Sequence, residues 1–182
     1  MNIEIINKET GEVELKHECH SFVLQYLQVI GYLMKGSQTS MKDITNTSRG
    51  FTTTPVTIDV FGVIGNVTRG LVVGSGTNGN SPNDYALQTL IAQGSSAGQL
   101  QYGIMSFTEA VVAGSNIAFV MQRDVTNGSG GNVTVNEIGV YFYTLFDSTP
   151  RSYCMVREEL GGPFVIANGA TKTVKFTINE TN

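Results

Sequence analysis

The chain has 182 residues, about the length of one domain, and a formal charge of −4. Charged residues make up only 14% of it, against about 25% in a typical globular protein, and Gly, Thr, Ser and Asn, which favour strands and turns, take their place. The lack of Lys/Arg clusters disfavours nucleic acid as a partner, and no apolar run approaches the ~20 residues that cross a bilayer, so we expect no membrane partner either.

The first third of the chain contains one helix pattern between two polar segments. Apolar residues alternate within residues 1–19 around a turn-like Glu-Thr-Gly, which fits either a short hairpin or a flexible arm. Apolar residues then recur at three- and four-residue steps over 20–35, so we predict a helix there, with Ser21 as N-cap and Gly36 as C′ residue. The Ser/Thr-rich remainder, to residue 54, is predicted to be a polar linker.

From residue 55 onward the apolar pattern changes to a period of two, which is typical of strands. The predicted strands, separated by Gly-, Asn- or Pro-containing turns, are 55–61, 70–74, 100–108, 116–125, 133–144, 152–158, 163–167 and 171–179, with a short strand or helical turn at 87–91. Short alternating strands at this spacing favour a mainly β protein, specifically an antiparallel β-sandwich of jelly-roll-like form over 55–182, with one N-terminal α-helix.

The strand over 133–144 carries side chains suited to burial on both of its faces. Alternation divides them into an aliphatic and aromatic set (Ile138, Val140 and Phe142) and an opposite set (Glu137, Tyr141 and Tyr143). The second face is therefore also expected to cover something, which we interpret as the helix, the N-terminal segment or another subunit.

Patterns that would indicate chemistry are incomplete. Residues 74–79 satisfy the G-x-G-x-x-G pattern, but turn residues follow where a dinucleotide site needs a helix, so we interpret them as a glycine turn. His17, Cys19 and His20 form a cluster, but zinc sites usually take two spaced pairs of ligands, and only Cys154 supplies a distant soft ligand. We therefore expect no catalytic, cofactor-binding or metal-binding residues, and no enzyme. The charged first twenty residues lack a secretory signal pattern, and both cysteines are expected to be free thiols.

Glu137 and Arg157 are each placed within an otherwise apolar or aromatic strand. A charge in such a strand is costly unless it is paired, and a short connection joins the two strands. We therefore predict a structural, partly buried ion pair between Glu137 and Arg157, or bonds from them to loop backbone. The alternative is that both charges are solvated near a sheet edge.

Several segments occur in an order that is typical of one class of protein. They are FVLQYLQVIGYLMKG (22–36), LVVGSGTNGNSPNDYALQTLI (71–91), NEIGVYFY (136–143), YCMVREEL (153–160) and GGPFVIANGATKTVKFTI (161–178). In this order they resemble bacteriophage tail and virion β-sandwich proteins over about residues 20 to 180. The glycine loop matches well, because Gly74-Ser-Gly-Thr is followed by Pro82 and Asp84, whereas the polar linker departs from the pattern.

The resemblance implies a structural component of a bacteriophage virion, in the tail or at a fibre attachment, that acts through protein–protein packing. Its expected partners are other virion proteins and copies of itself, and its expected location is the virion, after assembly in the host cytoplasm. We expect Tyr141, Tyr143 and Tyr153 to form the interface, and residues 1–15 to clasp a neighbour by strand addition. The alternatives are a head-decoration or head-fibre protein, a carbohydrate-binding module whose tyrosines stack on a host-surface glycan, and an enzyme that uses His17 or His20 with a carboxylate.

Overall fold

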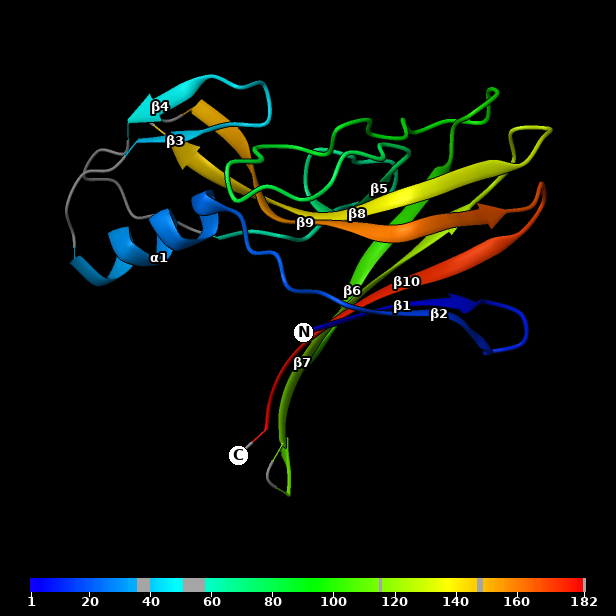
Figure 1. Ribbon diagram of the computed structural model, residues 1–182, viewed down its shortest axis with the longest axis horizontal. Coiled ribbons are helices and arrows are strands. Elements are labelled where there is room, and N and C mark those ends of the chain that lie inside the picture. Colours follow the sequence, from blue (N-terminus) through cyan, green and yellow to red (C-terminus); the bar gives the residue numbers. More distant parts are fainter. Residues whose placement is uncertain (36–39, 51–57, 115, 147–148, 182) are drawn as a thin grey trace.

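The computed structural model describes residues 1–35, 40–50, 58–114, 116–146 and 149–181, and it is mainly β with antiparallel sheets and one helix (Figure 1). The elements in chain order are β1 (Asn2–Asn7), β2 (Val13–Glu18), α1 (Leu24–Lys35), β3 (Ser40–Lys42), β4 (Ser48–Gly50), β5 (Gly70–Gly74), β6 (Gln101–Ala113), β7 (Asn116–Thr126), β8 (Val133–Phe146), β9 (Thr149–Ile166) and β10 (Thr171–Thr181). The fold class expected from the strand pattern is thus the observed one, while its jelly-roll form stays a prediction.

One sheet has five strands in the order β2-β1-β10-β7-β6. The N-terminal segment enters this sheet as the hairpin β1–β2, and β1 pairs with β10 along its whole length. Ile3 and Ile5 are buried by this pairing. The N-terminal segment is therefore the expected hairpin and not a free arm. Since β1 has a partner strand on each side, only β2 offers a free edge, and strand addition to a neighbour by residues 1–15 stays a prediction.

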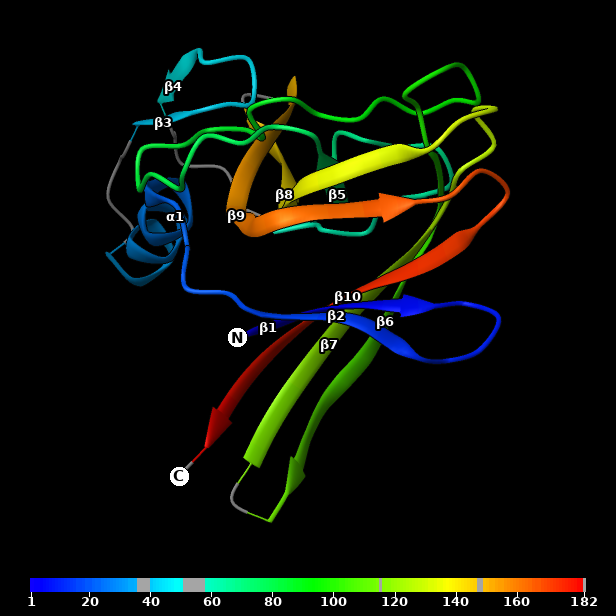
Figure 2. The same cartoon turned by 45° about the vertical axis from the view of Figure 1, so that its right-hand side comes forward.

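The second sheet has the order β5-β8-β9, and β8 and β9 form a long hairpin (Figure 2). The two strands predicted at 152–158 and 163–167 are one continuous strand, β9. The Gly-Gly-Pro sequence between them produces a shift of register opposite residue 136 instead of a turn. Gly161, with a φ of 72°, takes the left-handed conformation that this irregularity requires.

The main core lies between the two sheets, and its buried side chains form a single cluster to which both contribute. Val140 and Phe142 of β8 belong to this cluster, whereas Tyr141, on the opposite face of β8, packs in a second cluster with Val72 and Leu87. The second face of β8 is thus covered largely by the connection that follows β5, and not by another subunit.

The helix α1 begins at Leu24 and not at His20, because the residues before it bind the edge of β9. Phe22 forms an isolated antiparallel bridge with Val156, and the Val23 amide donates to the Met155 carbonyl at 3.2 Å. Hydrogen bonding to a strand edge thus replaces the first helical turn. Gly36, the expected C′ residue, lies outside the described residues. Among the described residues, no helical segment reaches the length and apolarity that crossing a membrane requires.

Part of the predicted linker is structured, because β3 and β4 form a small hairpin beside α1. Its turn is organised by Asp43, a buried carboxylate that accepts hydrogen bonds from the Thr45 and Thr47 amides and from Arg49. Burial by itself raises the pKa of Asp43, but these hydrogen bonds outweigh it and hold the pKa below its usual range.

Two expected elements, the strand over 55–61 and the short strand or helical turn over 87–91, are reduced to single bridges. Within 55–61, residues 55–57 lie outside the described residues, and the remainder forms only the bridge between Asp59 and Tyr143. Within 87–91, Leu90 bridges Gly74. Both segments are loops that cover the sheet. Their alternating apolar residues resemble a strand pattern, although each segment makes only one bridge to a strand.

Candidate functional site

The most concentrated set of charges lies where β8 and β9 meet the connection after β5. Arg157 Nε donates to Glu137 Oε2 at 2.8 Å, and Arg157 Nη1 donates to Asp84 Oδ2 at 2.7 Å. The side chains of Glu137 and Arg157 are 0% and 2% exposed, so this is a buried pair and the solvated alternative is wrong. The ion pair expected between these two strands is present, and Asp84 is a further member that the sequence analysis did not identify.

Glu137 also binds the segment 74–89, which we call the glycine loop. Its carboxylate accepts backbone N–H bonds from Gly76 at 3.1 Å, Gln88 at 3.0 Å and Thr89 at 2.8 Å. With the bond from Arg157, four donors surround a carboxylate that has no contact with solvent. Each donor compensates part of the cost of removing the charge from water.

Arg157 binds the same loop as Glu137 does. In addition to Glu137 and Asp84, its guanidinium donates to the carbonyl oxygens of Gly79 at 3.2 Å and Asn78 at 2.8 Å. Burial by itself lowers the pKa of Arg157, but the hydrogen bonds and charges of Asp84 and Glu137 raise it above the ordinary value. The guanidinium therefore stays charged and fixes the loop on the sheet.

The first two glycines of the G-x-G-x-x-G pattern make room for this carboxylate, whereas a Cβ on the third, Gly79, would meet nothing within 4 Å. A Cβ on Gly74 would lie 2.5 Å from Glu137 Oε1 and 2.7 Å from the Thr89 carbonyl oxygen. A Cβ on Gly76 would lie 2.5 Å from the same oxygen of Glu137 and 2.6 Å from Gln88 Cβ. The loop is thus a backbone cradle for a side chain of its own protein, which explains Gly74 and Gly76 without a nucleotide.

The tyrosines expected at an interface lie mostly inside the protein. Tyr141 is 1% exposed and its hydroxyl accepts the Leu87 amide at 2.6 Å, while Tyr153 is 0% exposed and its ring stacks on Phe142. Burial raises the pKa of both phenols, that of Tyr153 to about 12. Neither ring is available to a subunit or a sugar, so this part of the expected interface is wrong.

Tyr143 is the one of the three that is partly exposed, but its ring is already occupied. The guanidinium of Arg69 lies 4.9 Å from the ring centroid, in a cation–π contact. Arg69 is itself paired with Asp59 at 2.6 Å. Tyr143 therefore forms part of a local cluster with the covering loop at residues 58–69.

The His/Cys cluster before the helix is divided by the fold. His17 Nε2 lies 3.2 Å from Glu158 Oε1, whereas the side chain of His20 is 75% exposed. Glu158 also accepts the His20 amide and the side-chain amide of Asn80, so it joins β2, β9 and the glycine loop. Among the described residues, no three His, Cys, Asp or Glu side chains are grouped to hold a metal ion.

Both cysteines are free and buried. Burial raises the pKa of the Cys19 thiol to about 12 and that of the Cys154 thiol still further. The two belong to different buried clusters, so Cys154 does not complete a ligand set with His17 and Cys19. At neutral pH both are inert thiols that pack as small apolar side chains.

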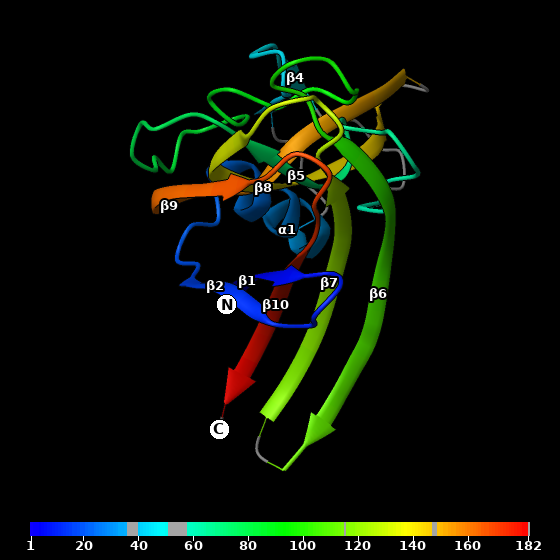
Figure 3. The ribbon, with the colours of Figure 1, turned by 90° about the vertical axis from the view of Figure 1, so that its right-hand side faces the viewer.

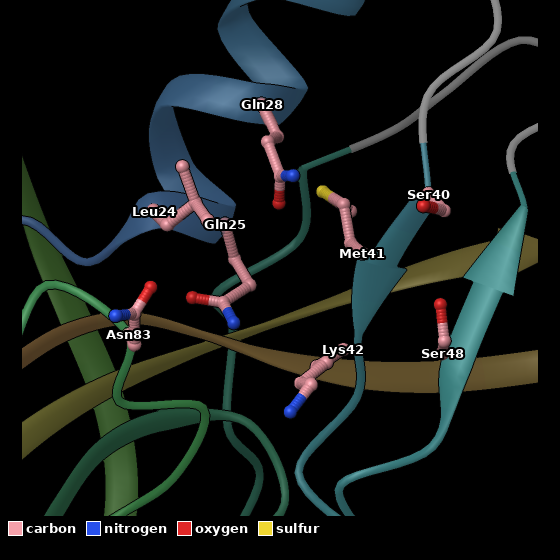
Figure 4. Close-up of a pocket in the computed structure, with 8 residues that line it drawn as sticks. All are labelled: Leu24, Gln25, Gln28, Ser40, Met41, Lys42, Ser48 and Asn83. Atoms are coloured by element: carbon pink, nitrogen blue, oxygen red, sulfur yellow. The ribbon is translucent and has the colours of Figure 1, made fainter.

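Two neighbouring cavities, which sequence reasoning missed, lie against the glycine loop. The first, which we call the helix cavity, has a volume of about 270 Å³ between α1 and the β3–β4 hairpin, and Figure 4 shows the amides of Gln25, Gln28 and Asn83 around it. The second, the loop cavity, has a volume of about 420 Å³ and is lined in part by Asp84 and Tyr85. Neither cavity is lined by His17 or His20. The enzyme alternative, which paired one of these histidines with a carboxylate, therefore finds no histidine in either cavity.

Comparison of the chain with protein-family models, with characterised proteins and with solved structures found no match.

Proposed function

We propose that this chain is a structural component of a bacteriophage virion, in the tail or at a fibre attachment, and that it acts by packing against copies of itself and other virion proteins. The observation that carries the proposal is a projecting, apolar hairpin. The order of sequence segments that resembles phage virion proteins supports the viral setting, and the hairpin supports the packing role.

The hairpin, which we call the β6–β7 arm, consists of residues 106–114 and 116–119. Figure 3 shows it extending away from the other sheet and from α1, with the end of β10 paired beside β7 as far as Asn116. Its exposed apolar side chains include Phe107 (37% exposed), Val111 (55%), Val112 (69%) and Ile117 (41%). Adjacent residues of a strand point to opposite faces, so Val111 and Val112 expose apolar surface on both. Several exposed apolar side chains gathered at one end of a sheet are typical of an interaction site.

The two edges of the five-stranded sheet differ in a way that supports the same conclusion. The edge strand β2 carries Glu14, Lys16 and Glu18 among six residues, and charges of this kind prevent edge-to-edge association. The other edge strand, β6, has Glu109 as its single charge among 13 residues. A shift of register between Thr108 and Val111 bends that edge. Because a bent edge pairs poorly with a further strand, we infer that the faces of the arm make the main contact.

The size of the protein in solution tests the packing role. We expect the wild-type chain to sediment as an oligomer at about 100 μM, the upper micromolar range where weak assemblies form, and Val112→Lys to sediment as a monomer. Val165→Lys is the matched control, because Val165 is a 49% exposed strand valine away from the arm. A monomeric wild-type protein, or equal disruption by both substitutions, would contradict packing through the arm.

The viral setting is tested separately, by mass spectrometry of purified virus particles from a culture that expresses the chain. We expect its peptides to remain with the particles through a density gradient. A reconstruction of the particle then distinguishes a tail or fibre-attachment position from the alternative, a head-decoration or head-fibre protein. Peptides found only in the soluble fraction would refute a virion location.

A further inference from the structure

We propose that the loop cavity and the helix cavity together form a binding site for a saccharide chain. This inference does not depend on the assembly role, because the cavities lie on residues that are separate from the β6–β7 arm. It also places sugar recognition away from Tyr141 and Tyr153, which are buried.

The loop cavity contains a carboxylate that the protein holds in one orientation. Asp84 Oδ2 accepts the Ser81 amide at 2.8 Å and Arg157 Nη1 at 2.7 Å, and the side chain of Asp84 is 24% exposed. Arg157 beneath it is 2% exposed and is itself fixed by Glu137. Among the described residues, no donor approaches the second oxygen, Oδ1, so it is left to accept a hydroxyl. Such preorganisation reduces the entropy lost on binding.

The same cavity offers a ring and amide groups beside that carboxylate. Tyr85 is half-buried and lines the cavity with Asn78 and Gln88. The Oε1 atom of Gln88 accepts the Asn78 amide at 2.8 Å, which leaves the Gln88 side-chain NH₂ as a donor. A sugar hydroxyl both donates and accepts, and a sugar ring has an apolar C–H face. A carboxylate, an amide donor and an aromatic ring therefore match its chemistry.

The helix cavity continues this chemistry on the other side of residues 83–85. Figure 4 shows Lys42 below the amide of Gln25. The Lys42 ammonium lies 5.8 Å from the Tyr85 ring centroid, over one face of that ring, so this pair lies between the two cavities and the other face of Tyr85 is the one proposed to contact a sugar. Asn83 and Gln28 add amides that both donate and accept. The adjoining volumes, of about 270 and 420 Å³, support a chain of at least two sugar units.

Gln25 gives an independent indication that the helix cavity takes a polar molecule. Its side chain is 2% exposed, and its Oε1 has no hydrogen-bond partner among the described residues. A buried carbonyl without a donor is unusual, because nearly all such groups are satisfied in folded proteins. The oxygen is enclosed in this conformation, and rotation about the broad terminal torsion of the side chain turns it toward a bound hydroxyl.

The charges around the cavities favour a hydroxyl-rich ligand over a polyanion. The negative charges of Asp84 and Glu137 balance the positive charges of Arg157 and Lys42. The Arg157 guanidinium already donates to Glu137, to Asp84 and to two loop carbonyls. A nucleotide or nucleic acid needs a surplus of cationic donors, which this arrangement lacks. We therefore infer a neutral saccharide chain as the occupant.

The test is a glycan array of neutral and acidic oligosaccharides, followed by saturation-transfer NMR with the neutral oligosaccharide of highest signal. We expect wild-type protein to bind neutral chains, Tyr85→Ala to bind them about tenfold more weakly, and Tyr85→Phe to retain binding because the ring remains. Gln28→Ala, in the other cavity, is expected to weaken long oligosaccharides more than monosaccharides.

Tyr143→Ala is the matched control, because it removes a partly exposed tyrosine away from both cavities, and we expect it to leave binding unchanged. No neutral glycan bound by the wild-type protein would overturn the inference, as would a preference for acidic glycans or binding that Tyr85→Ala does not alter. Since Tyr85 lies outside the β6–β7 arm, sedimentation of these variants separates failure of sugar binding from failure of assembly.

Discussion

The buried pair between Glu137 and Arg157 leads to the most demanding prediction, for the substitution Glu137→Gln. The amide retains one oxygen but replaces the other with an NH₂ group, which donates where the backbone amides of the glycine loop also donate. Breaking a buried pair costs about 3–5 kcal/mol. Because Asp84 still neutralises Arg157, we expect a loss near the lower end, about 3 kcal/mol of unfolding free energy.

Urea denaturation monitored by circular dichroism measures this loss. With a slope of about 2 kcal/mol/M, the midpoint should fall by about 1.5 M. Asp59→Asn is the matched control, because its ion pair with Arg69 is 2.6 Å long but the Asp59 side chain is 39% exposed. We expect that exposed pair to contribute less than about 1 kcal/mol.

Hydrogen exchange separates a local effect from a global one. In Glu137→Gln, the amides of Gly76, Gln88 and Thr89 should exchange faster than the amides of β10, because these three lose their carboxylate acceptor. A stability change within about 0.5 kcal/mol of zero, the scale of ordinary surface substitutions, would refute the reasoning that this charge cluster fixes the loop.

Three further predictions follow from the structure. Gly76→Ala should destabilise the protein by about 1–3 kcal/mol in urea denaturation, the usual cost of overpacking, because its Cβ would meet the Glu137 carboxylate, and an unchanged midpoint would contradict the cradle. Asp43→Asn should lower stability above about pH 4, and the difference from wild type should shrink as pH falls, because a lowered pKa in the folded state means that only the ionised carboxylate stabilises the fold. A difference in thermal melts that does not change with pH would argue against this. Cys19 and Cys154 should resist Ellman's reagent at pH 8 and react fully in urea, and prompt labelling of the native protein would contradict their burial.

The class of the fold could be predicted from local residue patterns alone. Alternation of apolar residues and Gly- or Asn-rich turns located β6, β7, β8 and β10, because these strands pair mainly with their neighbours along the chain or bury one face. The same alternation placed Glu137 within an apolar strand, and the cost of an unpaired charge there predicted a partner in Arg157. Both inferences depend on local pattern and on a general energetic rule, which a single sequence contains.

The segments that cover each face, and the charges that come together, could not be predicted in this way. The pattern of β8 required a cover for Tyr141, but Leu87 supplies it from 54 residues earlier, and Asp84 joins Arg157 across 73 residues. The helix lost its first turn to the edge of β9, since a free strand edge competes for the same backbone groups. Long-range contacts of this kind leave no periodic signal in the chain, because they depend on how separate segments pack and not on the spacing of residues within one segment.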